Sequence, residues 1–199
     1  MTTPSNIIQR SGFVCAVLAL GAIAQTRIPA AAAANWRIDP ARTHIAFAID
    51  AVGYPRTHGQ FRQFVGRISV DFDHPDKSAV SFHVQSQSVD VGSPSFDDYM
   101  RSTAFLDAAH YPSIDFVSKS VEKVGDHTVR VTGDLTLLGV TKPLSVDVEV
   151  ERQAGGGGGG RLEFLARTSI DRLAFGMNSG FPLVSREVEL VISSEAIEI

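Results

Sequence analysis

The chain of 199 residues has little cysteine, no excess of basic residues and no long apolar run. A single cysteine, Cys15, excludes an intramolecular disulfide framework and any multi-cysteine metal site. The 18 Lys and Arg residues stand against 22 Asp and Glu residues, and the resulting net charge of −4 gives no support to nucleic-acid binding, which usually needs a basic face. Apolar residues make up 44% of the chain, which excludes wholesale disorder and fits one globular domain.

The familiar signatures of enzymes are also missing. The sequence contains no nucleophile elbow, Walker motif, dinucleotide fingerprint or zincin helix. Its six histidines show neither the HxH nor the HxxxH spacing of a local metal site. We therefore expect no catalytic residue, no metal and no dedicated cofactor. The enzymatic alternative, an exported hydrolase or isomerase using Asp97 or His44, would require a polar and convergent pocket.

Residues 1–34 differ in composition from the rest. They contain no Asp or Glu, and an apolar run at 12–24 follows Arg10 and precedes an alanine-rich stretch at 30–34. This order is typical of a cleavable secretory signal. A retained membrane anchor is the alternative, but 13 residues are short for a membrane span. We expect a periplasmic domain at 35–199, whose net charge becomes −6 when Arg10 and Arg27 leave.

Alternation of apolar and polar residues dominates the rest of the chain, and it is the pattern of half-buried strands. One buried and one wet face per strand favours antiparallel pairing. Long strands favour a closed eight-stranded barrel over a two-sheet sandwich, because barrel strands are tilted. The predicted fold class is therefore all-β. The eight predicted strands lie at 43–52, 67–72, 79–89, 114–120, 129–137, 144–150, 162–168 and 188–192.

One region interrupts the pattern, between the third and fourth predicted strands. Residues 92–112 form a connection much longer than the other loops, and such loops are usually lids or functional insertions. Ser95 or Asp97 could cap a short helix that runs through Arg101, and Pro112 ends the insertion. The insertion, with its apolar side chains Phe96, Tyr99, Met100 and Phe105, is a candidate lid or a small hydrophobic plug.

The side chains predicted to face the interior mix large and small residues. The large residues are Phe47, Phe82, Phe116 and Phe164. The small residues are Ser86, Ser118, Ser120, Gly133, Ala166 and Thr168. An eight-stranded barrel either fills its interior or holds one small ligand. Composition alone leaves both possibilities open. The interior is either a lumen with space for a ligand or a solid core in which small residues fit the narrow parts of the barrel.

A series of motifs in order along residues 35–199 resembles the YceI-like family. Each motif is weak by itself, but together they are specific. They are WRID (36–39), THIAF (43–47), GQF (59–61), FVG (64–66), MRS (100–102), FLD (105–107), YPSIDF (111–116), GDLTLLGVTKP (133–143), IDR (170–172), FGM (175–177) and EV (187–188).

The resemblance implies a lipocalin-like barrel that is exported and holds a long amphiphile, such as a polyisoprenoid, an isoprenoid quinone or a fatty amide. A bound isoprenoid lipid or quinone would then be the only cofactor-like group, and the protein would be a monomer or homodimer without a membrane span after signal cleavage. A stress-response or structural module with a solid core is the alternative. The predicted ligand-binding residues are Phe47, Ile49, Phe82, Phe96, Tyr99, Met100, Phe105, Phe116, Leu135, Phe164, Phe175 and Met177.

The sequence also departs from the family pattern. The resemblance implies polar residues at four positions near the entrance of the cavity. Here these positions are Ala51, Phe96, Tyr99 and Ala104, which are apolar or aromatic. The apolar tunnel is retained, and the recognition of a head group is expected to differ.

Overall fold

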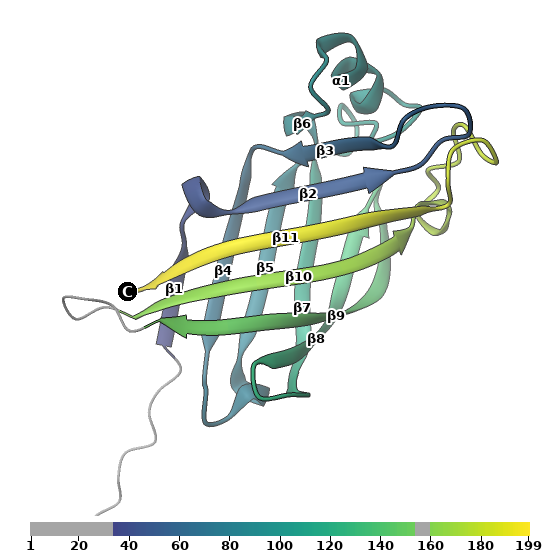
Figure 1. Cartoon of the computed structure of the whole chain (residues 1–199). Coiled ribbons are helices and arrows are strands. Elements are labelled where there is room, and N and C mark those ends of the chain that lie inside the picture. The colour runs from purple at the N-terminus through teal and green to yellow at the C-terminus, as the bar shows by residue number, and fades with distance from the viewer. Residues whose placement is uncertain (1–33, 154–159) are drawn as a thin grey trace, which may run out of the picture. The chain divides into compact units, whose positions relative to one another are not determined.

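Alternating residues build a closed antiparallel sheet in the computed structural model, which describes residues 34–153 and 160–199 (Figure 1). The predicted signal segment lies outside the described residues apart from Ala34. The strands described are β1 (Ala34–Ile38), β2 (His44–Ile49), β3 (Thr57–Phe61), β4 (Phe64–Val70), β5 (Ala79–Gln85), β6 (Val89–Asp90), β7 (Ser113–Lys123), β8 (Thr128–Leu137), β9 (Val140–Gln153), β10 (Arg161–Asp171) and β11 (Glu187–Glu198).

These segments combine into eight barrel strands, as the sequence predicts. β1 and β2 together form the first barrel strand, β3 and β4 the second, and β5 and β6 the third. Each later strand pairs with its sequence neighbour, and β1 closes the ring on β11, with Trp36 opposite Glu198 and Ile38 opposite Ala196. Every pairing is antiparallel, so the prediction of an eight-stranded antiparallel barrel is confirmed.

The first three barrel strands are each broken once, which the sequence pattern did not reveal. The breaks lie at the 3-10 helix η1 (Pro40–Arg42), at residues 62–63 and at η3 (Ser86–Ser88). Two further 3-10 helices, η2 (Pro75–Lys77) and η4 (Arg172–Phe175), lie in connections. The prediction omitted β1 and β3. In β3, Gly59 and Gln60 interrupt the apolar alternation that marks the other strands.

The prediction that Ser120 faces the interior is wrong, because β7 contains a β-bulge. Ile114 and Phe116 face inward as expected, but the register shifts between Ser118 and Ser120. Because a bulge adds one residue to a strand, the side chains beyond it exchange faces. Val121 therefore faces the interior in place of Ser120, and Ser118 uses its hydroxyl to accept a hydrogen bond from the backbone N–H of Val80 at 2.9 Å.

The helix α1 (Pro94–Arg101) lies between the third and fourth barrel strands, as predicted. Its N-cap is Ser93, whereas Asp97 accepts a hydrogen bond from the backbone N–H of Val91 at 2.7 Å. The guanidinium of Arg101 donates to the carbonyls of Gln87 and Val89, which ties the helix to β6. In the described part of the chain, no helix is long and apolar enough to cross a membrane.

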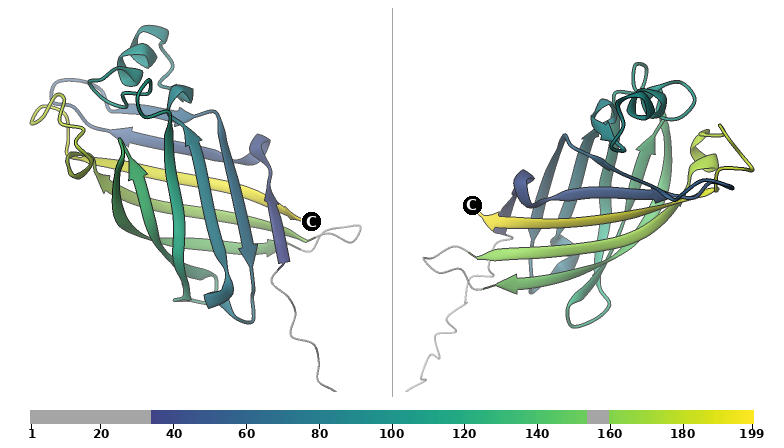
Figure 2. Two further views of the ribbon diagram at one scale, coloured as in Figure 1. Left: turned by 180° about the vertical axis from the view of Figure 1, so that it is seen from behind. Right: turned by 45° about the horizontal axis from the view of Figure 1, so that its top comes forward.

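The two ends of the barrel are built differently (Figure 2). The end that carries α1 and the loops 50–56 and 172–186 is called the closed end. The end that carries the hairpin connections 71–78 and 124–127 is called the open end. The larger core cluster, which includes Met100, Phe105 and Leu106, packs at the closed end. A smaller cluster near the open end contains Trp36, Ile38, Ile68, Leu162 and Ala196.

Candidate functional site

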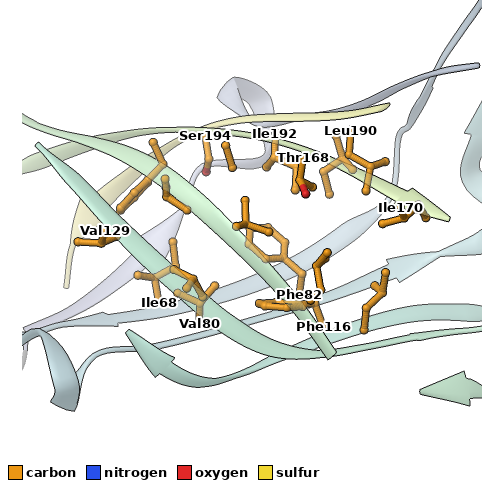
Figure 3. Close-up of a pocket in the computed structure, with 18 of the residues that line it drawn as sticks. Ile68, Val80, Phe82, Phe116, Val129, Thr168, Ile170, Leu190, Ile192 and Ser194 are labelled. Atoms are coloured by element: carbon orange, nitrogen blue, oxygen red, sulfur yellow. The ribbon is translucent and has the colours of Figure 1, made fainter. Parts of the chain in front are cut away.

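A cavity of about 330 Å³ lies inside the barrel. Inward side chains from β2 to β5 and from β7 to β11 surround it, and Figure 3 shows several of these side chains converging on the lumen. The side chains along the middle of the lumen are apolar except for Thr168 and Ser194. The wall is lined in its middle part by Ile68, Val80, Phe82, Phe116, Val131, Leu144, Val146, Val148, Phe164, Ala166, Thr168, Leu190, Ile192 and Ser194. An apolar lumen of this kind can hold a hydrocarbon chain.

Glycines on neighbouring strands make room for two of the phenylalanines. Gly59 pairs with Phe47, and a Cβ at Gly59 would lie 2.3 Å from the Phe47 ring. Gly66 pairs with Phe82, and a Cβ there would lie 2.9 Å from that ring and 2.1 Å from Ile38. The rings thus lie against the backbone of the next strand. This arrangement leaves space in the lumen that side chains at 59 and 66 would take.

The closed end of the lumen is filled by the insertion 92–112. Met100, Phe105 and Leu106 are buried and line the end of the cavity. The Tyr99 ring meets the Phe105 ring edge-on at 5.1 Å and stacks on Phe96 at 6.1 Å, outside the lumen. The insertion therefore acts as a hydrophobic plug in this structure, which was one of its two predicted roles.

Arg172 holds the β10–β11 loop in place beside the plug. The side chain is fully buried and its guanidinium donates to four backbone carbonyls, those of Met177, Ser179, Val184 and Ser185. Burial lowers the pKa of this guanidinium, and Asp171 opposes that effect, but an arginine remains charged at neutral pH. A buried charge is tolerated here because carbonyl dipoles surround it.

The open end of the lumen is a polar mouth. Lys123 at the end of β7 and Asp126 and His127 in the β7–β8 connection are exposed and line it. Phe72, which is 46% exposed, also lines it. Asp71 accepts backbone N–H bonds from His74 and Asp73 at 2.8 and 3.0 Å. The bond from His74, with smaller contributions from nearby charges, lowers the pKa of Asp71. The carboxylate thus fixes the shape of one side of the mouth.

Nine of the twelve predicted ligand-binding residues line the cavity. They are Phe47, Ile49, Phe82, Met100, Phe105, Phe116, Leu135, Phe164 and Met177. Phe96, Tyr99 and Phe175 lie outside the lining: Phe175 is buried in the core, Phe96 packs against that core, and Tyr99 is 47% exposed. Binding by any of the twelve stays a prediction.

The sequence interpretation also missed residues that line the cavity. Phe61 was missed because β3 lacks alternation, and Leu106 because only its neighbour Phe105 was considered part of the insertion's apolar face. Arg172 belongs to the IDR motif, but its burial was not predicted, since arginine is rarely buried. The mouth residues Lys123 and His127 follow the β7 bulge, which hid their orientation.

The four positions expected near an entrance lie at the closed end. Ala51 forms an isolated bridge with Val184, and Ala104 packs against the larger core cluster. Phe96 and Tyr99 belong to α1. The structure therefore places the departures from the family pattern at the end of the barrel opposite the polar mouth.

The candidate catalytic groups are not brought together. Asp97 bonds to Val91 N–H and lies 3.9 Å from Arg101, whereas His44 is exposed on the outer face of β2. Among the described residues, no group of three or more His, Cys, Asp or Glu side chains is arranged to hold a metal ion.

Comparison with known proteins agrees with the fold. A protein named YceI from Escherichia coli O157:H7 is 36% identical over 171 residues, covering 84% of this chain and 89% of that protein. The crystal structure of BcnA from Burkholderia cenocepacia superposes with a TM-score of 0.73 at 25% identity, covering 79% of this chain and 98% of BcnA. A polyisoprenoid binding domain from Saccharophagus degradans shares the fold, with a TM-score of 0.65 at 15% identity over 84% and 99% of the two chains. Residues 36–196 match the YceI-like domain. The chain therefore belongs to the YceI-like domain family.

Proposed function

We propose that this protein binds one single-chain amphiphile, a polyisoprenoid, isoprenoid quinone or fatty amide, with its hydrocarbon part in the barrel lumen. The observation that carries the proposal is the apolar cavity of about 330 Å³ that reaches a polar mouth. A solid-core module would have no such space. The Saccharophagus degradans neighbour, a polyisoprenoid binding domain, supports the class of ligand.

The hydrophobic effect is large enough to drive this binding. Each buried methylene contributes ~0.8 kcal/mol, so an isoprene unit of five carbons contributes about 4 kcal/mol. Association costs roughly 4–15 kcal/mol, which about one to four buried units offset. The length of chain in the lumen would therefore set the affinity, and the head group would set the orientation.

The size of the cavity indicates how much chain is enclosed. An apolar cavity of roughly 150 Å³ in another protein binds one benzene molecule. The lumen, at about 330 Å³, is only about twice that size. A long polyisoprenoid would thus be enclosed over part of its length, and the remainder would extend through the mouth past Phe72 and Lys123.

The proposal includes export to the periplasm through cleavage of residues 1–34, and binding rather than catalysis. The acid-free N-terminal segment with its short apolar run supports export. The middle part of the lumen contains no Asp, Glu, His, Lys or Arg side chain, which supports a carrier, because acid–base chemistry would need such groups placed there. Any redox chemistry would belong to a bound quinone.

Native mass spectrometry of protein purified from the periplasm, followed by organic extraction, tests the proposal. We expect a bound isoprenoid or fatty amide. Protein that is empty, and that also fails to take up a ubiquinone or a fatty amide after purification, would overturn the proposal. A protein that stays in the cytoplasm would overturn the export part alone.

A matched pair of variants on β10 places the ligand. Thr168 faces the lumen and its neighbour Arg167 faces outward. Thr168→Trp fills the lumen and should lower the affinity for a fatty amide by on the order of tenfold or more, since several buried methylenes are displaced. Arg167→Trp should leave the affinity unchanged. Equal affinities for the two variants would show that the ligand lies elsewhere.

A further inference from the structure

Two loops at the closed end carry an exposed apolar surface outside the cavity. Val52 and Tyr54 in the loop 50–56 are 69% and 77% exposed, and Phe181 and Leu183 in the loop 172–186 are 54% and 64% exposed. We call these four residues the apolar tip. Three of them are among the four most exposed large apolar side chains of the described residues. Single exposed apolar residues are common, but a group of this kind marks an interaction surface.

The apolar tip is held together by hydrogen bonds between the two loops. The N–H of Val52 donates to the carbonyl of Leu183 at 2.8 Å, and Ser185 N–H donates to Asp50 at 2.8 Å. Figure 1 shows the two loops side by side at the right of the barrel. Arg172 fixes the second loop from within through its four carbonyl partners. The apolar side chains are thus presented on a pre-organised scaffold.

Charge separates the apolar tip from the rest of an acidic chain. No Asp or Glu occurs between Asp50 and Asp71 or between Asp171 and Glu187, although the chain has 22 acidic residues. The charges at the base of the tip are paired, with Arg56 2.6 Å from Glu189 and Arg186 2.7 Å from Asp171. The open end, in contrast, carries acidic residues on its hairpin connections, at Asp71, Asp73, Asp76 and Asp126.

We infer that the apolar tip docks the protein on the surface of a phospholipid bilayer. Tyrosine suits the interface between head groups and hydrocarbon, and the transfer of Phe, Leu and Val side chains out of water lowers the free energy. A tip without carboxylates meets no repulsion from lipid phosphates, whereas the acidic connections of the open end would be repelled. The docked protein would direct the loops 50–56 and 172–186 toward the bilayer and its mouth away from it.

Docking goes beyond the proposed ligand binding and does not depend on it. None of the four tip residues lines the cavity. An empty protein should therefore bind vesicles as well as a loaded one, and the tip can be changed without altering the lumen.

Flotation with vesicles of phosphatidylethanolamine and phosphatidylglycerol tests the inference. The tip variant combines Val52→Ser, Tyr54→Ser and Leu183→Ser. The control combines Val65→Ser and Val117→Ser, two residues of the outer wall that are 58% and 57% exposed. Wild type and control should bind equally, and the tip variant should bind on the order of tenfold more weakly because it loses apolar area. All three proteins should melt at similar temperatures.

A second measurement reports which residues reach the lipid. Leu183→Trp adds a second tryptophan to the buried Trp36, and Val65→Trp does the same on the outer wall. Brominated lipids should quench the fluorescence of the first variant and leave that of the second unchanged.

Three outcomes would overturn docking. They are a wild type that does not bind vesicles, a tip variant that binds as well as the wild type, and equal quenching of the two tryptophan variants. If the tip variant loses a dimer seen by light scattering and wild type ignores vesicles, a second copy covers the tip instead. Uptake of a soluble fatty amide by the tip variant is measured separately, so failure of ligand binding does not count against docking.

Discussion

The two ends of this barrel are made by the same alternating strands and differ in what closes them. At the closed end, Met100, Phe105 and Leu106 are only 4–7% exposed. At the open end, inward residues such as Val129 and Val150 remain half-buried, and short connections leave the mouth uncovered. The difference shows that strand alternation creates an interior, whereas the connections decide whether that interior is filled or hollow.

The largest expected effect concerns Arg172 at the closed end. Arg172→Met leaves four backbone carbonyls of the β10–β11 loop without their donor, and such buried acceptors are costly to leave unpaired. We expect a loss of about 3–5 kcal/mol in the free energy of unfolding, measured by urea denaturation. Arg186→Met removes an exposed ion pair from the same loop and should cost less than about 1 kcal/mol. Similar costs for both would show that Arg172 does not hold the closed end.

The next effect compares one phenylalanine from each end. Phe105→Ala removes a buried ring from the plug and should destabilise the protein by about 3–5 kcal/mol. Phe72→Ala at the mouth removes an exposed ring that touches Trp36 and Arg152, and should cost about 1 kcal/mol. Thermal and urea unfolding measure both. A mouth variant as unstable as the plug variant would contradict the contrast between the ends.

A smaller effect is expected in the wall between the ends. Gly66→Ala places a methyl group against Ile38 and the Phe82 ring. The ring must move toward the lumen, so we expect a cost of about 1–3 kcal/mol and weaker binding of a fatty amide. Gly125→Ala, in the β7–β8 connection, meets only Thr128 at 3.3 Å and serves as the control. Unchanged amide affinity in Gly66→Ala would show that the ring does not border the ligand.

The smallest effect is a pH dependence at the open end. The pKa of Asp71 is lowered in the folded protein, chiefly by the N–H of His74, so its stabilising contribution is present above pH ~4, where the unfolded carboxyl is also ionised. This contribution is lost as the pH falls through the lower folded-state value. The protection factors for hydrogen exchange at residues 71–78, which are corrected for the slower intrinsic exchange at low pH, should therefore fall in acid, and Asp71→Asn should remove that dependence. An unchanged dependence in the variant would assign it to another group.

Much of the barrel follows from local sequence, because strand alternation reports which face of a strand is buried. All four inward residues predicted for the strand β9, from Leu144 to Val150, line the cavity. The bulge at Ser118–Ser120 was not predictable, since two serines give no apolar signal on either face.

The site was predictable where it lies on strands and less so where it lies on connections. Met100 and Phe105 were identified as apolar residues of the insertion, but which of its side chains enter the lumen depends on how α1 packs. The position of the mouth depends on the lengths of hairpin connections at opposite ends. Arg172 acts through carbonyls of a loop up to 13 residues away in sequence, which no short motif describes.

Calorimetric titration of the empty protein with fatty amides of increasing chain length tests the central claim most directly. Burial of the chain predicts about a fourfold gain in affinity for each added methylene, and a negative heat-capacity change. The gain should stop when the lumen of about 330 Å³ is full. An affinity that does not depend on chain length would contradict the account, because it would show that the hydrocarbon stays outside the lumen.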